Sequence, residues 1–153
     1  MVRFAIAGPI ARDHIILPSG ERLEKYGAVA YTAAAMARLL EGSGDDLLCL
    51  SHVAPADYPA VVALLDHPNI DLSGVVPVEN GTTEIELTYL NEHERVSRQI
   101  NIMPSLTVAE MERLADCQAV LFSPLNDTDI PPAGLHKLRS GTGKVFFLDV
   151  HGL

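Results

Sequence analysis

Short apolar runs, separated by stretches of helical character, constrain the fold of this 153-residue chain more than any other feature. The runs occupy residues 2–7, 46–53, 119–124 and 144–150. A run that is apolar along its whole length is typical of a strand that is buried on both faces of a parallel sheet. Between the runs, an alanine-rich segment over residues 29–40 predicts a helix that stops before Gly42. The order of elements predicts right-handed crossovers and an α/β fold, a parallel sheet flanked by helices.

The other elements of the expected sheet layer follow the same alternation. We expect a strand over residues 71–78 and helices over 57–65, 105–116 and 134–140. The start of the helix over residues 105–116 is recognisable, because Thr107 and Glu110 have the spacing of a capping box.

Two segments, 15–26 and 82–102, do not fit this parallel sheet. Residues 84–89 alternate polar and apolar side chains, and the polar stretch 91–94 predicts a hairpin turn. Alternation indicates a sheet with one face in water or against another body. We therefore assign both segments to a separate small β layer.

Composition excludes several classes of function. The chain carries 11 basic and 20 acidic residues, a formal net charge of −9, which disfavours binding to nucleic acid or an anionic membrane. No apolar run approaches the roughly 20 residues of a membrane span. Cys49 and Cys117 lie in apolar surroundings and are expected to be buried thiols in a reducing compartment, so we expect a cytoplasmic protein.

The last expected strand, 144–150, is followed by three residues and by no helix. A parallel sheet with one uncovered side exposes apolar surface. We expect the chain to be one part of a larger fold; the alternative is that a partner subunit covers that side.

A few residues are candidates for binding chemistry. Asp13 follows the first strand, where open α/β sheets bind ligands, although an aspartate there can also cap a turn. Gly27 precedes the alanine-rich helix and would let the backbone come close to a ligand, or would serve as a simple loop glycine. The segment 141–144 (GTGK) is interpreted as a structural turn, since it enters a strand instead of leaving one. The six histidines show no metal-ligand spacing, so no metal site is expected.

Taken in order, these segments resemble the ribokinase-like family of carbohydrate kinases, also called the phosphofructokinase-B family. The first strand with Asp13 resembles the family's opening strand, and residues 27–34 resemble its di-glycine motif and following helix. Residues 70–75, 82–83 and 147–152 resemble, in turn, its aspartate-serine-glycine-valine segment, its lid and a strand bearing a buried aspartate. The resemblance covers residues 1–153 as a single substrate-binding half of the family's domain, with lid segments at 15–26 and 82–102.

The resemblance implies a function. The complete enzyme would be an ATP-dependent kinase that transfers the γ-phosphoryl group, with Mg²⁺, to a hydroxyl of a sugar or nucleoside. Asp13 would accept hydrogen bonds from substrate hydroxyls, the backbone at Gly27 and Ala28 would line the sugar, and Thr32 and Asn126 would complete the lining. The lid would close over the site and would pair between two subunits in a homodimer.

The sequence also departs from the family pattern. Ala28 stands where the family has its second motif glycine, and residues 54–57 (APAD) replace a glycine-x-aspartate segment. The motif glycine-alanine-glycine-aspartate, which supplies the family's catalytic base and anion hole, is missing. We therefore assign no catalytic residue and expect the 153-residue chain to be inactive alone. Two alternatives stay open: a non-catalytic half-domain that binds a polyol, and a module whose hairpin serves dimerisation.

Overall fold

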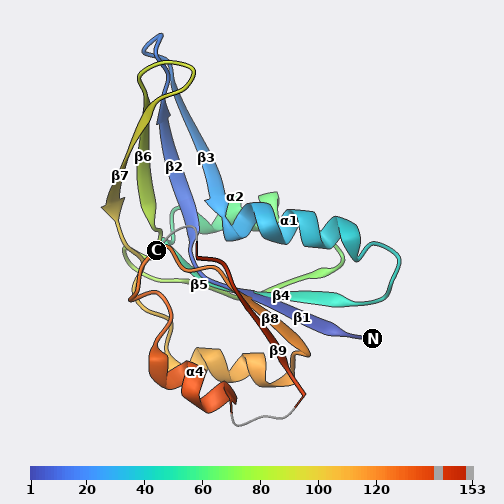
Figure 1. Ribbon diagram of the computed structural model, residues 1–153. Coiled ribbons are helices and arrows are strands. Elements are labelled where there is room, and N and C mark those ends of the chain that lie inside the picture. Colours follow the sequence, from blue (N-terminus) through green and yellow to red (C-terminus); the bar gives the residue numbers. More distant parts are fainter. Residues whose placement is uncertain (140–142, 151–153) are drawn as a thin grey trace.

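The computed structural model of the protein describes residues 1–139 and 143–150 and contains two sheets (Figure 1). The strands are β1 (Arg3–Ala7), β2 (Ile10–Ile16), β3 (Arg22–Ala28), β4 (Asp46–Val53), β5 (Ile70–Pro77), β6 (Glu84–Tyr89), β7 (Arg95–Asn101), β8 (Ala119–Phe122) and β9 (Val145–Leu148). The helices are α1 (Val29–Leu39), α2 (Tyr58–Leu64), α3 (Val108–Met111) and α4 (Pro132–Arg139), with a 3₁₀ segment, η1 (Glu112–Asp116).

The larger sheet confirms the predicted fold class. Its five strands run parallel in the order β5-β4-β1-β8-β9, so the chain crosses from the middle of the sheet to one edge and then to the other. Helices α1 and α2 cover one face, while α3, η1 and α4 lie on the opposite face (Figure 1). Within the described residues, no helix has the length and apolar character needed to cross a membrane.

Each face of the sheet has its own apolar core. On the α1 side, Ala30 and Ala33 are buried in the same cluster as side chains of the strands, and these small side chains let the helix pack close to the sheet. On the other side, Met111 and Leu114 pack against Leu50 of β4. Both cysteines are buried and free, as expected.

The expected helix over residues 105–116 is only partly α-helical. The capping box is present, because the Thr107 hydroxyl accepts from the Glu110 amide and the Glu110 carboxylate accepts from the Thr107 amide. After Met111 the chain tightens into 3₁₀ geometry, a common ending for short helices, and this turn brings Leu114 into the core.

The strand predicted over residues 144–150 is present, but the prediction that it is buried is wrong. Strand β9 exists, but Val145 is 51% exposed, Phe147 56% and Leu148 58%. The physical reason is position, since β9 pairs only with β8 and no described element covers its outer edge. The run is apolar in the way a central strand is, yet it lies at the margin of the sheet.

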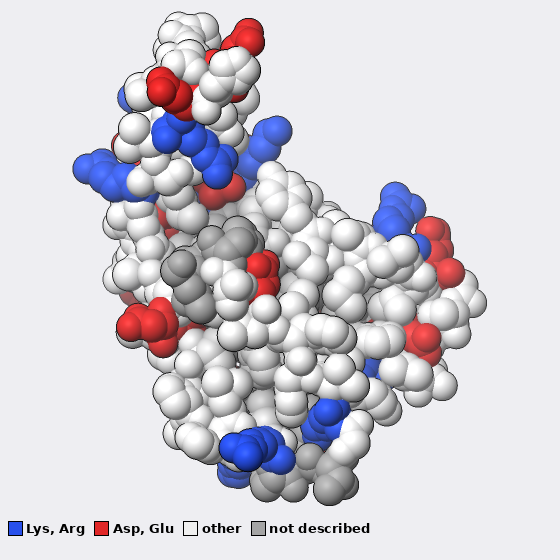
Figure 2. Space-filling view, in the orientation of Figure 1, with Lys and Arg blue, Asp and Glu red and all other residues white. Residues whose placement is uncertain are grey.

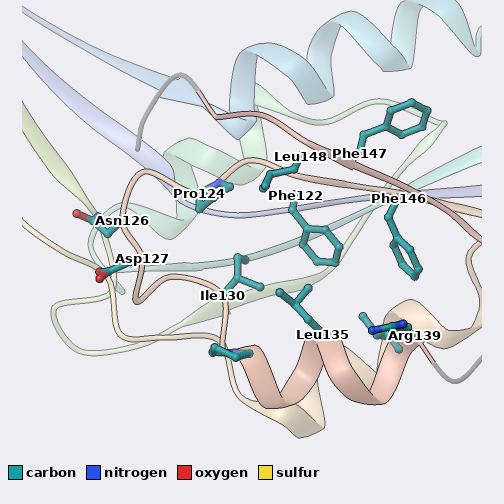
Figure 3. Close-up of a pocket in the computed structure, with 12 residues that line it drawn as sticks. Phe122, Pro124, Asn126, Asp127, Ile130, Leu135, Arg139, Phe146, Phe147 and Leu148 are labelled. Carbon is teal, nitrogen blue, oxygen red and sulfur yellow. The ribbon is translucent and has the colours of Figure 1, made fainter.

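The same margin opens an apolar cavity of about 510 Å³ between β9 and α4 (Figure 3). Phe122 and Phe146 point into it toward Leu135, with their ring centroids 6.1 Å apart, whereas Phe147 points to the other side of the strand. Parallel sheets are normally covered on both faces, so this surface is as apolar as a protein core although it is exposed.

The smaller sheet, which we call the lid sheet, consists of β2, β3, β6 and β7 in the order β3-β2-β6-β7 and projects away from the α/β layers (Figure 1). It is the separate β layer expected from the alternating segments, although it begins at Ile10 and not near residue 15. Gly8 makes the step from β1 into β2 possible: its φ is +152°, and a Cβ there would lie 2.3 Å from the Ser123 carbonyl oxygen.

A buried carboxylate, Asp57, joins the lid sheet to the α/β body. Its oxygens accept hydrogen bonds from the hydroxyls of Tyr26 at 2.8 Å and Thr82 at 2.6 Å, and from the Arg12 guanidinium at 3.2 Å. Burial, together with the bond to Asp57, raises the pKa of Tyr26 to about 12. Asp57 directly precedes α2, while its partners belong to or adjoin β2, β3 and β6, so this side chain links three strands of the lid to the body.

Candidate functional site

A cavity of about 610 Å³ lies between the lid sheet and the start of α1. Strands β2, β6 and β7, helix α1 and the loop after β8 all contribute to its wall. The lining residues are Ala11, Asp13, Ala28, Tyr31, Thr32, Ile85, Leu87, Arg95, Ser97, Gln99 and Leu125.

Strand register explains why these residues share one face. Asp13 lies opposite Ile85 in the β2–β6 pair, and Ile85 lies opposite Gln99 in the β6–β7 pair. Because side chains alternate along a strand, every second residue from these positions faces the cavity, which includes Ser97 and Arg95. The intervening residues form the outer face, where His14 bonds to Glu84 at 2.6 Å.

Asp13 supplies the carboxylate of this cavity. It is half-buried, and burial raises the pKa of its carboxyl above the usual range, while the positive charges of Arg95 and His14 oppose part of that rise. The side chain lies against Gly27, where an added Cβ would be 2.7 Å from Asp13 Oδ2. Glycine at position 27 therefore leaves room for the carboxylate.

Ala28, the last residue of β3, directly precedes α1 and adopts a strained conformation. Its φ of 51° and ψ of −117° lie in a region that glycine adopts readily and that a residue with a Cβ avoids. This is the position at which the sequence departs from the di-glycine pattern. The chain therefore carries an alanine in a backbone conformation that suits glycine.

Replacing Ala28 with Gly is expected to stabilise the protein. Relief of the strain outweighs the extra entropy of the unfolded chain, and we expect a gain of about 1 kcal/mol in the free energy of unfolding. Urea unfolding measures it. Ala30→Gly is the matched control, since Ala30 lies inside α1 and its replacement should cost about 1 kcal/mol. A loss of stability in Ala28→Gly would contradict the strain argument.

The structure brings most of the sequence-predicted site residues together. Asp13, Ala28 and Thr32 line the cavity, and Gly27 backs the Asp13 carboxylate. Asp13 follows the first strand, as expected, but it lies within strand β2 of the lid sheet, which was expected to begin near residue 15. Asn126 lies at the apolar cavity beside β9, while its neighbour Leu125 reaches the lid cavity.

Sequence reasoning missed the contribution of β7. Arg95 directly follows the expected hairpin turn at 91–94 and was not named as a site residue, but it lines the cavity, as do Ser97 and Gln99. Their spacing of two residues is the signal that could have placed them on one face of a strand. The register with β6, which decides which face is inward, is not visible in the sequence.

The chain offers little to a metal or to a phosphate donor in its described part. Residues 1–139 and 143–150 contain no group of three or more His, Cys, Asp or Glu side chains suited to a metal ion. Ser140, Gly141, Thr142 and His151 lie outside the described residues. The Lys144 amine donates to the Cys117 carbonyl at 3.1 Å, a contact that holds this side chain against the body of the protein.

Comparisons with known proteins find similarity in structure. A pyrophosphate-dependent kinase of the ribokinase family, bound to a pyrophosphate analogue and myo-inositol, superimposes with a TM-score of 0.68 at 25% identity over 97% of this chain. The Arabidopsis thaliana ribokinase bound to ribose and ATP gives 0.74 at 17% identity over the whole chain. The chain has a ribokinase-like fold. The Halothermothrix orenii fructokinase, at 0.67 and 15% identity over 97% of the chain, has the same fold.

This ribokinase-like chain spans about half the length of the structures that it matches. It covers 48% of the pyrophosphate-dependent kinase, 55% of the Arabidopsis ribokinase and 57% of the fructokinase. No protein-family model matches its sequence, and no curated protein does. The similarity therefore establishes the fold of a half-length domain, and the open margin at β9 agrees with an incomplete sheet.

Proposed function

We propose that the chain is the substrate-binding portion of a sugar or nucleoside kinase. The complete enzyme transfers the γ-phosphoryl group of ATP, with Mg²⁺, to a hydroxyl of the bound substrate. The observation that carries the proposal is the position of Asp13, a half-buried carboxylate within a 610 Å³ cavity between a β lid and a helix start. Cavities of roughly 300–1,000 Å³ suit small ligands.

Each part of the cavity has a role in holding a polyol. The Asp13 carboxylate accepts hydrogen bonds from two neighbouring hydroxyls, and the hydroxyls of Thr32 and Ser97 contribute further polar contacts. Ile85, Leu87 and other apolar side chains contact the carbon faces of the ring. Closure of the lid excludes water from the acceptor hydroxyl. The catalytic base and the phosphate-binding groups belong to the remainder of the complete domain.

Calorimetric titration tests the proposal on the chain as it stands. Ribose, fructose, myo-inositol and adenosine are titrated separately, and at least one is expected to bind with one-to-one stoichiometry. Absence of binding by all four, in a chain that circular dichroism shows to be folded, would contradict the proposal. A second titration with ATP, and another with pyrophosphate, measures whether the chain alone holds either donor; we expect neither to bind.

The alternative function is a non-catalytic half-domain that binds a polyol or dimerises. One observation favours dimerisation: β3 and β7 are the edges of the lid sheet, and edge strands pair readily with another copy. A homodimer formed through the lid is part of our proposal for the complete enzyme as well. Sedimentation equilibrium measures it, and a dimer that binds no polyol would favour the structural role over the kinase.

The size of the native protein separates a fragment from a stand-alone half-domain. Immunoblotting of the source with an antibody to this chain is expected to detect a species near twice 16.5 kDa. A native species of 16.5 kDa would favour the non-catalytic alternative, because the chain carries no identified base.

A further inference from the structure

The cavity face of the lid carries more positive than negative charge, although the whole chain has a net charge of −9. Arg95 lines the cavity, and the register places Lys25 directly opposite Asp13 in the β2–β3 pair. Two cations thus share this face with one carboxylate. Figure 2 shows Lys and Arg side chains along the middle of the lid, with acidic side chains nearer its tip.

Arg95 differs from Arg12 and Arg98, two other arginines of the lid, in its protein partners. Arg98, on the outer face of the same strand, pairs with Glu86 at 3.6 Å, and Arg12 pairs with Glu24 at 2.6 Å and with Asp57. Among the described residues, no carboxylate lies within 4 Å of the Arg95 guanidinium, which donates to the Tyr89 hydroxyl at 3.4 Å. Arg95 is an exposed residue at the cavity wall, so its guanidinium is accessible to a ligand there.

Asp13 and Arg95 stand at two ends of this face. Asp13 is on β2 and Arg95 on β7, with β6 between them. The β2–β6 and β6–β7 registers place Asp13 level with Gln99, and Arg95 lies four residues from Gln99 along β7. The backbones of Asp13 and Arg95 are therefore roughly 10 Å apart across the sheet and about 13 Å apart along it. Both side chains line the same cavity of about 610 Å³, which places them within reach of a single ligand.

We propose that the acceptor substrate is an anionic polyol, whose carboxylate or phosphate binds Arg95 while its hydroxyls bind Asp13. The inference rests on the proposed function and specifies its substrate class. A guanidinium presents paired donors that match the two oxygens of a carboxylate or phosphate, which a neutral hydroxyl cannot match. The side chains of Ser97 and Gln99, between the two ends, add neutral hydrogen-bonding groups along the substrate.

Matched ligand pairs test the substrate class by calorimetry. The pairs are sorbitol with gluconate and ribose with ribose 5-phosphate, so the two arms separate a carboxylate from a phosphate. At least one anion is expected to bind about tenfold tighter than its neutral counterpart. Arg95→Gln should remove this preference, since the variant loses the positive charge and retains a hydrogen-bonding side chain.

Arg98→Gln is the matched control, because it removes the same charge from the outer face of the same strand and should keep the preference. The inference is overturned if neutral polyols bind and neither anion binds tighter, a result that leaves the proposed function standing. It is also overturned if Arg95→Gln and Arg98→Gln reduce the preference equally, because the effect would then be general electrostatics. Binding of no polyol, charged or neutral, overturns both proposals.

Discussion

Replacing Asp13 with Asn is expected to weaken polyol binding by about 100-fold. A hydrogen bond to a charged group contributes about 1.5–3 kcal/mol, so the loss of two charged bonds gives roughly 3 kcal/mol, which corresponds to this factor. The variant keeps the size of the side chain and its place beside Gly27, so the cavity retains its shape. Calorimetric titration of the wild-type and variant chains measures the ratio of dissociation constants.

The pH dependence of binding provides an independent readout of the same carboxylate. Because burial raises the pKa of Asp13 above the ordinary 3.8, protonation begins at a higher pH than in an exposed aspartate. Protonated Asp13 loses its charge, so polyol affinity falls as the pH falls through the raised pKa. The affinity of Asp13→Asn should stay flat over that range.

Glu86→Gln is the control for Asp13→Asn, since it removes a carboxylate from the outer face of the same sheet. It should leave the dissociation constant unchanged. Equal effects of the two substitutions, or an Asp13→Asn chain that binds like the wild type, would show that the cavity carboxylate does not hold the substrate.

Replacing Asp57 with Ala is expected to lower the free energy of unfolding by about 3–5 kcal/mol, because it leaves buried partners without their acceptor. The Tyr26 and Thr82 hydroxyls and one side of the Arg12 guanidinium lose the carboxylate that joins them. Urea unfolding measures the change. Asp57→Asn keeps one acceptor oxygen and should fall between the wild type and Asp57→Ala, which keeps the test usable if the alanine variant does not fold.

Asp57 acts on the site by positioning the lid, so its replacement should also weaken polyol binding in chains that remain folded. Glu24→Gln is the control: it removes the other partner of Arg12, which is exposed, and should leave both stability and binding nearly unchanged. If Asp57→Asn destabilises the chain without any change in the dissociation constant, Asp57 supports the fold but does not orient the lid.

The layered architecture was predictable because its signals are local. An apolar run such as residues 46–53 indicates a buried strand by its own hydrophobic pattern, and the alanine-rich stretch before Gly42 indicates both a helix and the place where it ends. Alternation over residues 84–89 was enough to separate the lid from the parallel sheet. Capping at Thr107 was likewise visible, because a capping box lies within four residues.

What the sequence could not supply were relations between distant segments. The apolar run at β9 has the composition of a central strand, and its exposure depends on which strands and helices lie beside it. Arg95 could be placed on a strand, but the β6–β7 register decides that it faces the cavity. Asp57 lies in residues 54–57, which replace the family's glycine-x-aspartate segment. Comparison with that motif therefore did not identify Asp57 as the residue that joins the lid to the body.

The central claim is that the cavity between the lid sheet and α1 holds a polyol, and an NMR titration tests it most directly. Amide shifts are recorded for the ¹⁵N-labelled chain while the tightest-binding polyol of the calorimetric panels is added. We expect saturable shifts at Asp13, Thr32, Ile85 and Gln99, with little change at Phe146 beside the apolar cavity. Shifts confined to the β9–α4 surface, or none at saturating polyol, would contradict it.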